Sequence, residues 1–99
     1  PERDMALRIA KRILRKNLVD FLPIGKDIEI IEIEVSDRMV GKTIVDMDLR
    51  RRYSLNVIAI HHEEQIETDV RPDCRLCHGD TITVIGKEEN VTRFADDYS

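Results

Sequence analysis

Apolar residues recur at two different spacings along the chain, and each spacing predicts a different kind of element. Through residues 3–19 they fall three or four positions apart, which predicts an amphipathic helix with a basic opposite side. The apolar stripe consists of Met5, Ala6, Ile9, Ala10, Ile13, Leu14 and Leu18. A basic side can meet a membrane surface or a partner, but the narrow aliphatic stripe favours a helix that packs on its own domain. Pro23 and Gly25 predict the turn that follows.

Residues 28–35 follow the two-residue spacing of a strand. Glu32 and Glu34 alternate with apolar residues, so we expect one buried face and one solvated face. The alternation changes phase between Ile30 and Ile31. That change predicts a β-bulge, or a first half of the strand that is covered on both faces.

The segment from residue 41 to residue 60 combines a turn, a short helix and a strand. Residues 41–43 (GKT) form a turn that can start a helix, and residues 44–53 then show helical spacing, which predicts one buried face. The apolar positions of this helix are Ile44, Val45, Leu49 and Tyr53. Residues 56–60 are a continuous apolar run rich in β-branched residues, which is typical of a buried strand.

The last third of the chain predicts two more strands and a helix. A polar turn at 61–65 leads to a short strand at 66–70, a loop at 72–80 and a strand at 81–85. A helix is expected at 88–98, with Asn90 as its N-cap and a buried stripe of Val91, Phe94 and Ala95. Strands joined by tight turns favour an α+β fold: a small mixed or antiparallel sheet with an N-terminal, a short central and a C-terminal helix.

Length and charge narrow the class of protein. The 99 residues support one domain, and a net charge of −4 argues against a general nucleic-acid binder. No apolar stretch approaches the roughly 20 residues of a membrane helix, and the start of the chain shows no signal peptide. Two cysteines do not form the disulfide framework of a small secreted domain, so we expect a cytoplasmic protein. A start at Pro1 predicts that the chain is a piece of something longer.

The motif Cys74-Arg75-Leu76-Cys77-His78 reads C-x-x-C-H, the attachment pattern of c-type haem. A haem also needs a deep apolar pocket and a second axial ligand. A zinc site formed by both cysteines, His78 and one of His61 or His62 is a second interpretation, although a lone C-x-x-C is a weak zinc signature. Incidental loop cysteines and surface histidines are the interpretation that we favour. No catalytic constellation is present, so we do not expect an enzyme.

Arg50, Arg51 and Arg52 end the predicted central helix. They are either a solvated charge run or part of an anion site, because guanidinium groups match phosphate in shape and charge. The second interpretation gains support from Asn56, whose amide can hydrogen-bond a base or ribose, and from apolar neighbours that can hold a base. These neighbours are Ile44, Val45 and Pro72.

Short stretches in a fixed order also carry a resemblance to a known family. They are residues 31–35 (IEIEV), 41–43 (GKT), 48–50 (DLR), 56–60 (NVIAI), 72–73 (PD), 79–80 (GD) and 84–86 (VIG), with Phe94 in the last helix. Together they resemble the RCK C-terminal domain, also called the TrkA-C domain, and the first half is most similar to cytosolic gating subunits of Ktr-type potassium uptake systems. Residues 1–20 resemble the crossover helix from a missing N-terminal domain, which leaves 21–99 as the regulatory ligand-binding domain.

The resemblance implies a homodimer that binds cyclic di-AMP in its cleft and controls potassium transport through a membrane channel or transporter subunit. The positions that match the family's ligand contacts are Ile44, Val45, Asp48, Arg50, Asn56, Val57 and Pro72, with Arg52 and Leu55 nearby. No cofactor and no nucleic-acid partner are implied. The alternatives are a dimerisation module that binds no ligand or responds to a divalent cation, and the metal or haem protein built on Cys74, Cys77 and His78.

Overall fold

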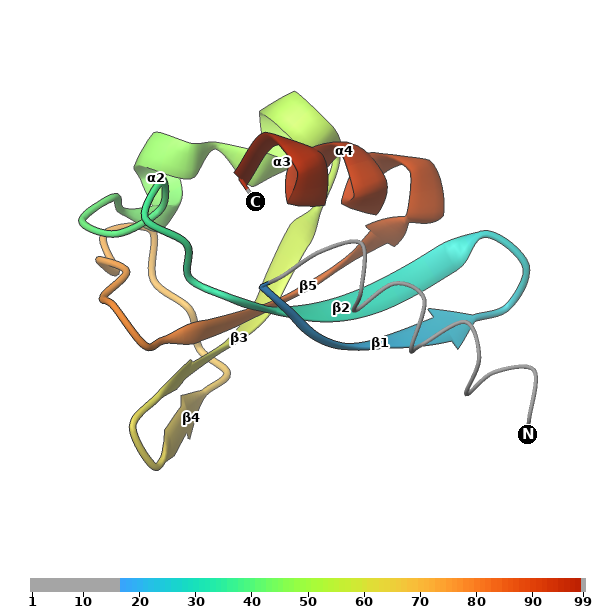
Figure 1. Cartoon of the computed structure of the whole chain (residues 1–99). Coiled ribbons are helices and arrows are strands. Elements are labelled where there is room, and N and C mark those ends of the chain that lie inside the picture. The colour runs from blue at the N-terminus through green and yellow to red at the C-terminus, as the bar shows by residue number, and fades with distance from the viewer. Residues whose placement is uncertain (1–16, 99) are drawn as a thin grey trace.

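The structure is a computed structural model and describes residues 17–98. These residues form an antiparallel sheet of five strands, with helices packed against it (Figure 1). Its spatial order is β1-β2-β5-β3-β4. The strands are β1 (Leu18–Ile24), β2 (Ile28–Glu34), β3 (Asn56–His62), β4 (Gln65–Glu67) and β5 (Thr81–Lys87), and the helices are α2 (Ile44–Met47), α3 (Leu49–Tyr53) and α4 (Glu88–Tyr98). The helices lie on one side of the sheet (Figure 1), so the predicted α+β class with an antiparallel sheet is confirmed.

The hydrophobic core lies between this side of the sheet and the helices. Helix α4 packs over β2 and β5 and contacts α3. Its buried residues are Val91, Phe94, Ala95 and Tyr98, which confirms the predicted stripe and extends it by one turn. The prediction of Asn90 as the N-cap is wrong. Strand β5 runs directly into α4, and the backbone N–H of Glu88 donates to the carbonyl of Asp27 at 2.9 Å.

Residues 18–24 form the edge strand β1, so the prediction that the first helix continues to residue 19 is wrong. Leu18 and Phe21 are both buried although they lie three positions apart. A register shift between Leu18 and Asp20 explains this spacing, because a bulge adds one residue and brings both side chains to the core face. Pro23 is tolerated because β1 is an edge strand, which within residues 17–98 pairs with β2 alone. The rest of the predicted N-terminal helix lies outside the described residues.

Strand β2 confirms the predicted strand but contains neither a bulge nor a phase change. It pairs with β5 in unbroken register from Ile28 to Glu34. Glu29 shares the buried face with Ile31 and Ile33 and is only 4% exposed, while Ile28 and Ile30 are half-buried on the other face. Glu29 therefore occupies a core-facing position where an apolar residue is expected. Its presence there makes the apolar–polar alternation of the sequence look interrupted.

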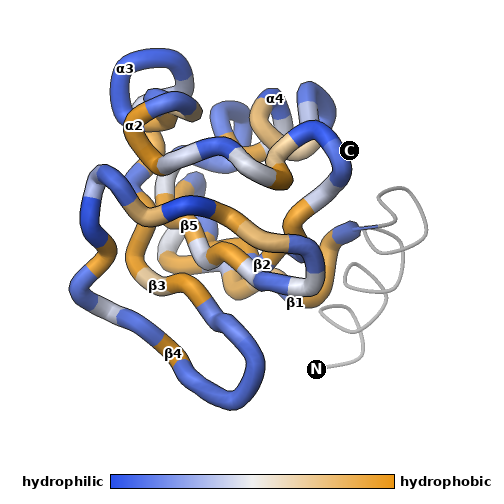
Figure 2. The backbone as a smooth tube through the Cα atoms, turned by 90° about the vertical axis from the view of Figure 1, so that its left-hand side faces the viewer, coloured by the Kyte–Doolittle hydropathy of each residue, from blue (hydrophilic) through white to orange (hydrophobic). Residues whose placement is uncertain are grey.

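The hairpin of β3 and β4 and the loop that follows match the predicted order. Figure 2 shows the turn of this hairpin as a hydrophilic segment that projects away from the helices. Strand β3 is less buried than predicted, because Ile60 is buried but Ile58 is 38% exposed. A register shift between Val57 and Ala59 interrupts its pairing with β5. None of the helices within residues 17–98 is long and apolar enough to cross a membrane.

Candidate functional site

A hollow of about 270 Å³ lies where α2, α3 and the start of β3 meet. Its lining residues are Ile44, Val45, Asp48, Leu49, Arg50, Leu55, Asn56, Val57 and Val70. All the predicted site residues except Arg52 and Pro72 are among them. Sequence reasoning missed two lining residues, Leu49 and Val70. Leu49 was assigned only to the buried face of the helix, and Val70 carries no signal beyond its place at the end of a predicted strand.

Asp48 divides the predicted central helix into α2 and α3. Its backbone is left-handed, at φ 47° and ψ 46°, and its N–H donates to the carbonyl of Ile44 at 3.1 Å. Aspartate tolerates this conformation better than most side chains, although a strained non-glycine residue still costs on the order of 1 kcal/mol. The residue at this break between the two short helices is also one of those that line the hollow.

The floor of the hollow is apolar. Leu49 and Leu55 are 3% and 1% exposed, and Ile44 and Val57 are partly buried against the core. Val45 is 60% exposed, so the prediction that it belongs to the buried face is wrong. Helix α2 has a single turn, and Met47 takes the core-facing position instead. Val45 therefore presents apolar surface at the mouth of the hollow.

The three consecutive arginines do not converge on one point, because two of them contact different partners. Arg51 pairs with Asp48 at 3.0 Å. Arg52 donates to the hydroxyl of Tyr98 at 3.1 Å and lies over the ring of Tyr53, and the Tyr98 contact raises the pKa of its guanidinium. Among the described residues Arg50 alone of the three has no side-chain hydrogen bond or ion pair, and it lines the hollow. Its guanidinium is the one available to an anion.

Pro72 does not line the hollow but contacts the start of α2 through its backbone. Its carbonyl accepts the N–H of Val45 at 2.9 Å, and the carbonyl of Cys74 accepts the N–H of Ile44 at 3.1 Å. The N–H of Gly41 likewise donates to the carbonyl of Leu76 at 2.8 Å. The loop of residues 72–76 thus fixes the position of α2 through its backbone, which an argument from side chains could not predict.

The predicted helix start at 41–43 is confirmed, because Thr43 is the N-cap of α2. Thr43 and Asp46 form a capping box there. The Thr43 N–H donates to Asp46 at 3.0 Å, and the Asp46 N–H donates to the Thr43 hydroxyl at 3.0 Å. The contact with the backbone of Thr43 is the main cause of a lowered pKa for Asp46, below its ordinary 3.8.

We expect Asp46→Ala to destabilise the protein at neutral pH and to cost progressively less in acid. The pKa of Asp46 is lower in the folded than in the unfolded state, so its contribution is complete above about pH 4 and disappears as the pH falls through the folded value. Urea unfolding of both proteins between pH 7 and about pH 3 measures the difference. A difference that stays constant over this range would show that the carboxylate charge contributes nothing to the cap.

Gly86 on β5 supports the floor of the hollow from the sheet side. A Cβ at this position would come within 2.3 Å of the Leu55 Cδ2 and 3.3 Å of the Ser54 carbonyl oxygen. Leu55 is buried, so its side chain cannot swing away freely. We expect Gly86→Ala to lower the free energy of unfolding by roughly 1–3 kcal/mol through overpacking, as measured by urea unfolding. The control is Lys87→Ala, which changes an exposed residue at the end of the same strand and should alter stability by no more than about 0.5 kcal/mol.

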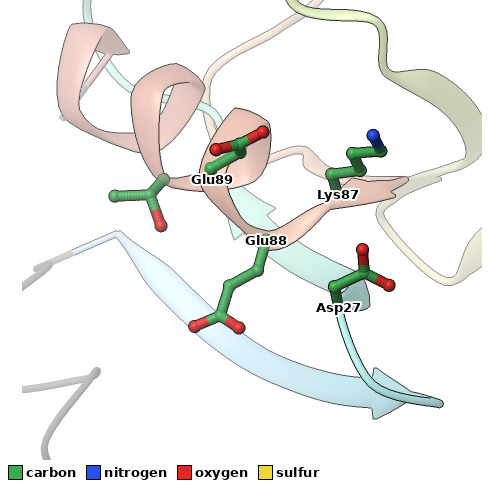
Figure 3. A pocket seen from close by; sticks show the side chains of 5 residues that line it. Asp27, Lys87, Glu88 and Glu89 are labelled. Carbon is green, nitrogen blue, oxygen red and sulfur yellow. The ribbon is translucent and has the colours of Figure 1, made fainter.

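A second and larger hollow, of about 520 Å³, lies between the turn after β1 and the start of α4. Figure 3 shows Asp27, Lys87, Glu88 and Glu89 around it. Carboxylates outnumber the single lysine here, which disfavours a phosphate-containing ligand. Its size alone does not make it the better candidate for such a ligand.

The metal or haem site on the C-x-x-C-H motif, which the sequence left as an alternative, is not assembled as a unit within residues 17–98. Cys77 lies with His62 and Asp80, whereas Cys74 and His78 belong to no metal-competent cluster among residues 17–98. Cys74 is a half-buried thiol whose pKa is raised by burial, and His78 is exposed. His62 bonds to Asp80, and this hydrogen bond raises the pKa of the imidazole.

Comparison with known proteins places the chain in a family. Residues 28–97 match the TrkA-C domain. The Ktr system potassium uptake protein C of Bacillus subtilis is 33% identical over 95% of this chain and 42% of its own length. The Ktr system potassium uptake protein A of Vibrio alginolyticus is 31% identical over 92% of this chain and 41% of its own. The chain thus spans less than half the length of these relatives.

Two solved structures are similar in both sequence and fold. The RCK C domain of the potassium transport protein KtrA, in complex with cyclic di-AMP, has a TM-score of 0.66 at 25% identity and covers 94% of this chain and 98% of its own. The RCK_C domain dimer of BusR from S. agalactiae, also in complex with cyclic di-AMP, has a TM-score of 0.61 at 26% identity over 68% and 91%. With its own fold and the match over residues 28–97, the chain belongs to the TrkA-C domain family.

Proposed function

We propose that this chain is the regulatory domain of a potassium uptake system and that it binds cyclic di-AMP across a homodimer interface. The observation that carries the proposal is the hollow between α2, α3 and β3, which combines an apolar floor with the guanidinium of Arg50 and the amide of Asn56. Two similar RCK C domains were solved in complex with this ligand.

The chemistry of the hollow suits a nucleotide. Leu49, Leu55 and Val57 offer the apolar surface on which a base can rest. Arg50 can donate two parallel hydrogen bonds to one phosphate, and no carboxylate in the described part of the chain competes for it. Asn56 opens β3 at the edge of the hollow and is exposed, so its amide can read a base or ribose edge.

The size and symmetry of the site favour two copies of the chain. A hollow of about 270 Å³ is slightly smaller than a typical small-molecule pocket of about 300–1,000 Å³, so one hollow alone is small for a dinucleotide. A two-fold dimer supplies two hollows and two Arg50 guanidinium groups, one for each phosphate of a two-fold ligand. The exposed Val45 at the mouth provides apolar surface for the second copy or for the ligand.

In this mechanism the ligand acts by bridging two subunits. A ligand that contacts both hollows stabilises one dimer geometry over others, by the difference in its affinity for them. The relatives named as Ktr potassium uptake proteins are about twice as long as this chain, so the remaining part would carry that geometry to a membrane subunit. The domain would act from the cytoplasm.

Thermal unfolding with three nucleotides tests the proposal. Cyclic di-AMP at about 100 times its dissociation constant should stabilise the folded protein by about 2.7 kcal/mol, while cyclic di-GMP and ATP should leave the melting temperature unchanged. Equal shifts for all three nucleotides would indicate a general anion effect. No shift with any of them would reduce the chain to a dimerisation module without this ligand.

A further inference from the structure

A group of three different metal-ligating side chains lies away from the hollow, where the end of β3 meets the loop before β5. The ligand atoms of His62, Cys77 and Asp80 all lie within 4.8 Å of one another. The Nδ1 of His62 is 2.5 Å from Oδ1 of Asp80. Segments far apart in the chain thus supply a nitrogen, a sulfur and an oxygen to one point.

Asp80 is the fixed member of the group. Its side chain is only 4% exposed, and its second oxygen, Oδ2, accepts the backbone N–H of Cys77 at 3.0 Å. Its own backbone is held on both sides, since its carbonyl accepts the N–H of Val35 at 2.8 Å and its N–H donates to the carbonyl of Cys77 at 3.1 Å. A buried carboxylate held this firmly costs little reorganisation when it becomes a ligand.

We propose that His62, Cys77 and Asp80 bind a divalent transition-metal ion of the Zn²⁺ class. Imidazole and thiolate together select such borderline ions over Mg²⁺ and Ca²⁺, which prefer oxygen ligands alone. Three protein ligands leave a fourth tetrahedral position for water. His62 and Cys77 are exposed, so an ion can reach the site from solvent.

Binding requires small movements and the release of protons. Zinc bonds of about 2.0–2.3 Å place the ligand atoms of a tetrahedral site further apart than the present His62–Asp80 contact, so the His62 ring must withdraw slightly to admit the ion. The proton shared by His62 and Asp80 and the thiol proton of Cys77 pass to solvent when the ion binds. The bound ion would then tie the β3–β4 hairpin to the loop of residues 72–80.

This assignment differs from a zinc site on the C-x-x-C-H motif, because it uses Asp80 and leaves out Cys74 and His78. It also does not depend on the proposed nucleotide site. Titration with Co²⁺ under reducing conditions, on protein without a histidine tag, tests it through the thiolate-to-cobalt charge-transfer band. We expect one Co²⁺ per chain, with a band that Zn²⁺ removes by competition.

Variants identify the ligands. Cys77→Ser should abolish the charge-transfer band, and His62→Gln should weaken Co²⁺ binding by about tenfold or more, whereas Cys74→Ser and His78→Ala should leave both unchanged. His62 and Cys77 are exposed, so thermal unfolding should show both variants folded. The proposal is overturned if the unsubstituted protein gives no thiolate band. It is equally overturned if the band survives Cys77→Ser and disappears in Cys74→Ser.

Discussion

Phe94→Ala is expected to lower the free energy of unfolding by about 3–5 kcal/mol, the range for a large aromatic side chain removed from a core. Phe94 is fully buried in α4. Its ring lies 5.7 Å from that of Tyr53 and 5.3 Å from that of Tyr98, so the substitution removes two aromatic contacts as well as apolar burial. The loss is large relative to a total stability of roughly 5–15 kcal/mol, and urea unfolding measures it.

Glu89→Ala is the matched control for Phe94→Ala because it changes an exposed residue of the same helix. Its effect should stay within about 0.5 kcal/mol. If Phe94→Ala were as stable as this control, α4 would not be packed over β2 and β5 as described. Because Tyr53 ends α3, the same experiment also tests how firmly the helix that carries Arg50 is anchored.

Arg50→Ala is expected to weaken cyclic di-AMP binding by about a hundredfold or more. A hydrogen bond to a charged group contributes roughly 1.5–3 kcal/mol, and a two-fold dimer loses one such contact at each phosphate. The sum of about 3 kcal/mol or more corresponds to two powers of ten in the dissociation constant. Calorimetric titration of the variant measures the change, and its melting temperature without ligand should be unaltered because Arg50 is exposed.

Arg51→Ala is the control for Arg50→Ala. It removes the same charge from the neighbouring position, but Arg51 is paired with Asp48 and does not line the hollow. Its effect on binding should be less than about threefold, since exposed ion pairs contribute little. Equal losses in the two variants would mean that net charge, and not a defined phosphate contact, controls binding.

The order of most elements could be predicted because hydrophobic spacing is strong in β2, β5 and α4. Strand β1, in contrast, could not be predicted from its hydrophobic spacing. A bulge in β1 places Leu18 and Phe21, three residues apart, on one face, and this spacing is that of a helix. Leu18 and Phe21 continue the helical spacing predicted for residues 3–19, so this spacing does not indicate where the strand begins.

The structure brings most of the predicted site residues around one hollow, but the arrangement of their side chains could not be predicted. Seven of the nine predicted positions converge on the hollow, and all seven lie on the short segment from Ile44 to Val57. The sequence could not show that Asp48 adopts a left-handed conformation, or that consecutive arginines separate toward Asp48 and Tyr98. Consecutive positions on a helix differ by about 100° in direction, so a charge run rarely meets one ligand.

The proximity of His62 to Asp80 is also a product of the fold. The two residues lie 18 positions apart, and β3 pairs with β5 only as far as Thr81, opposite His61. The sheet register brings the ends of both strands together, along with the cysteine that precedes Asp80 by three positions. The C-x-x-C-H motif lies in the same loop, but the proposed site takes only Cys77 from it.

Isothermal titration of the purified chain with cyclic di-AMP tests the central claim most directly, because it measures affinity and stoichiometry together. We expect saturable binding at one ligand per two chains, with no heat from cyclic di-GMP or ATP. Binding at one ligand per chain would contradict the shared dimer site. No heat with any ligand, together with an unchanged melting temperature, would contradict cyclic di-AMP binding itself.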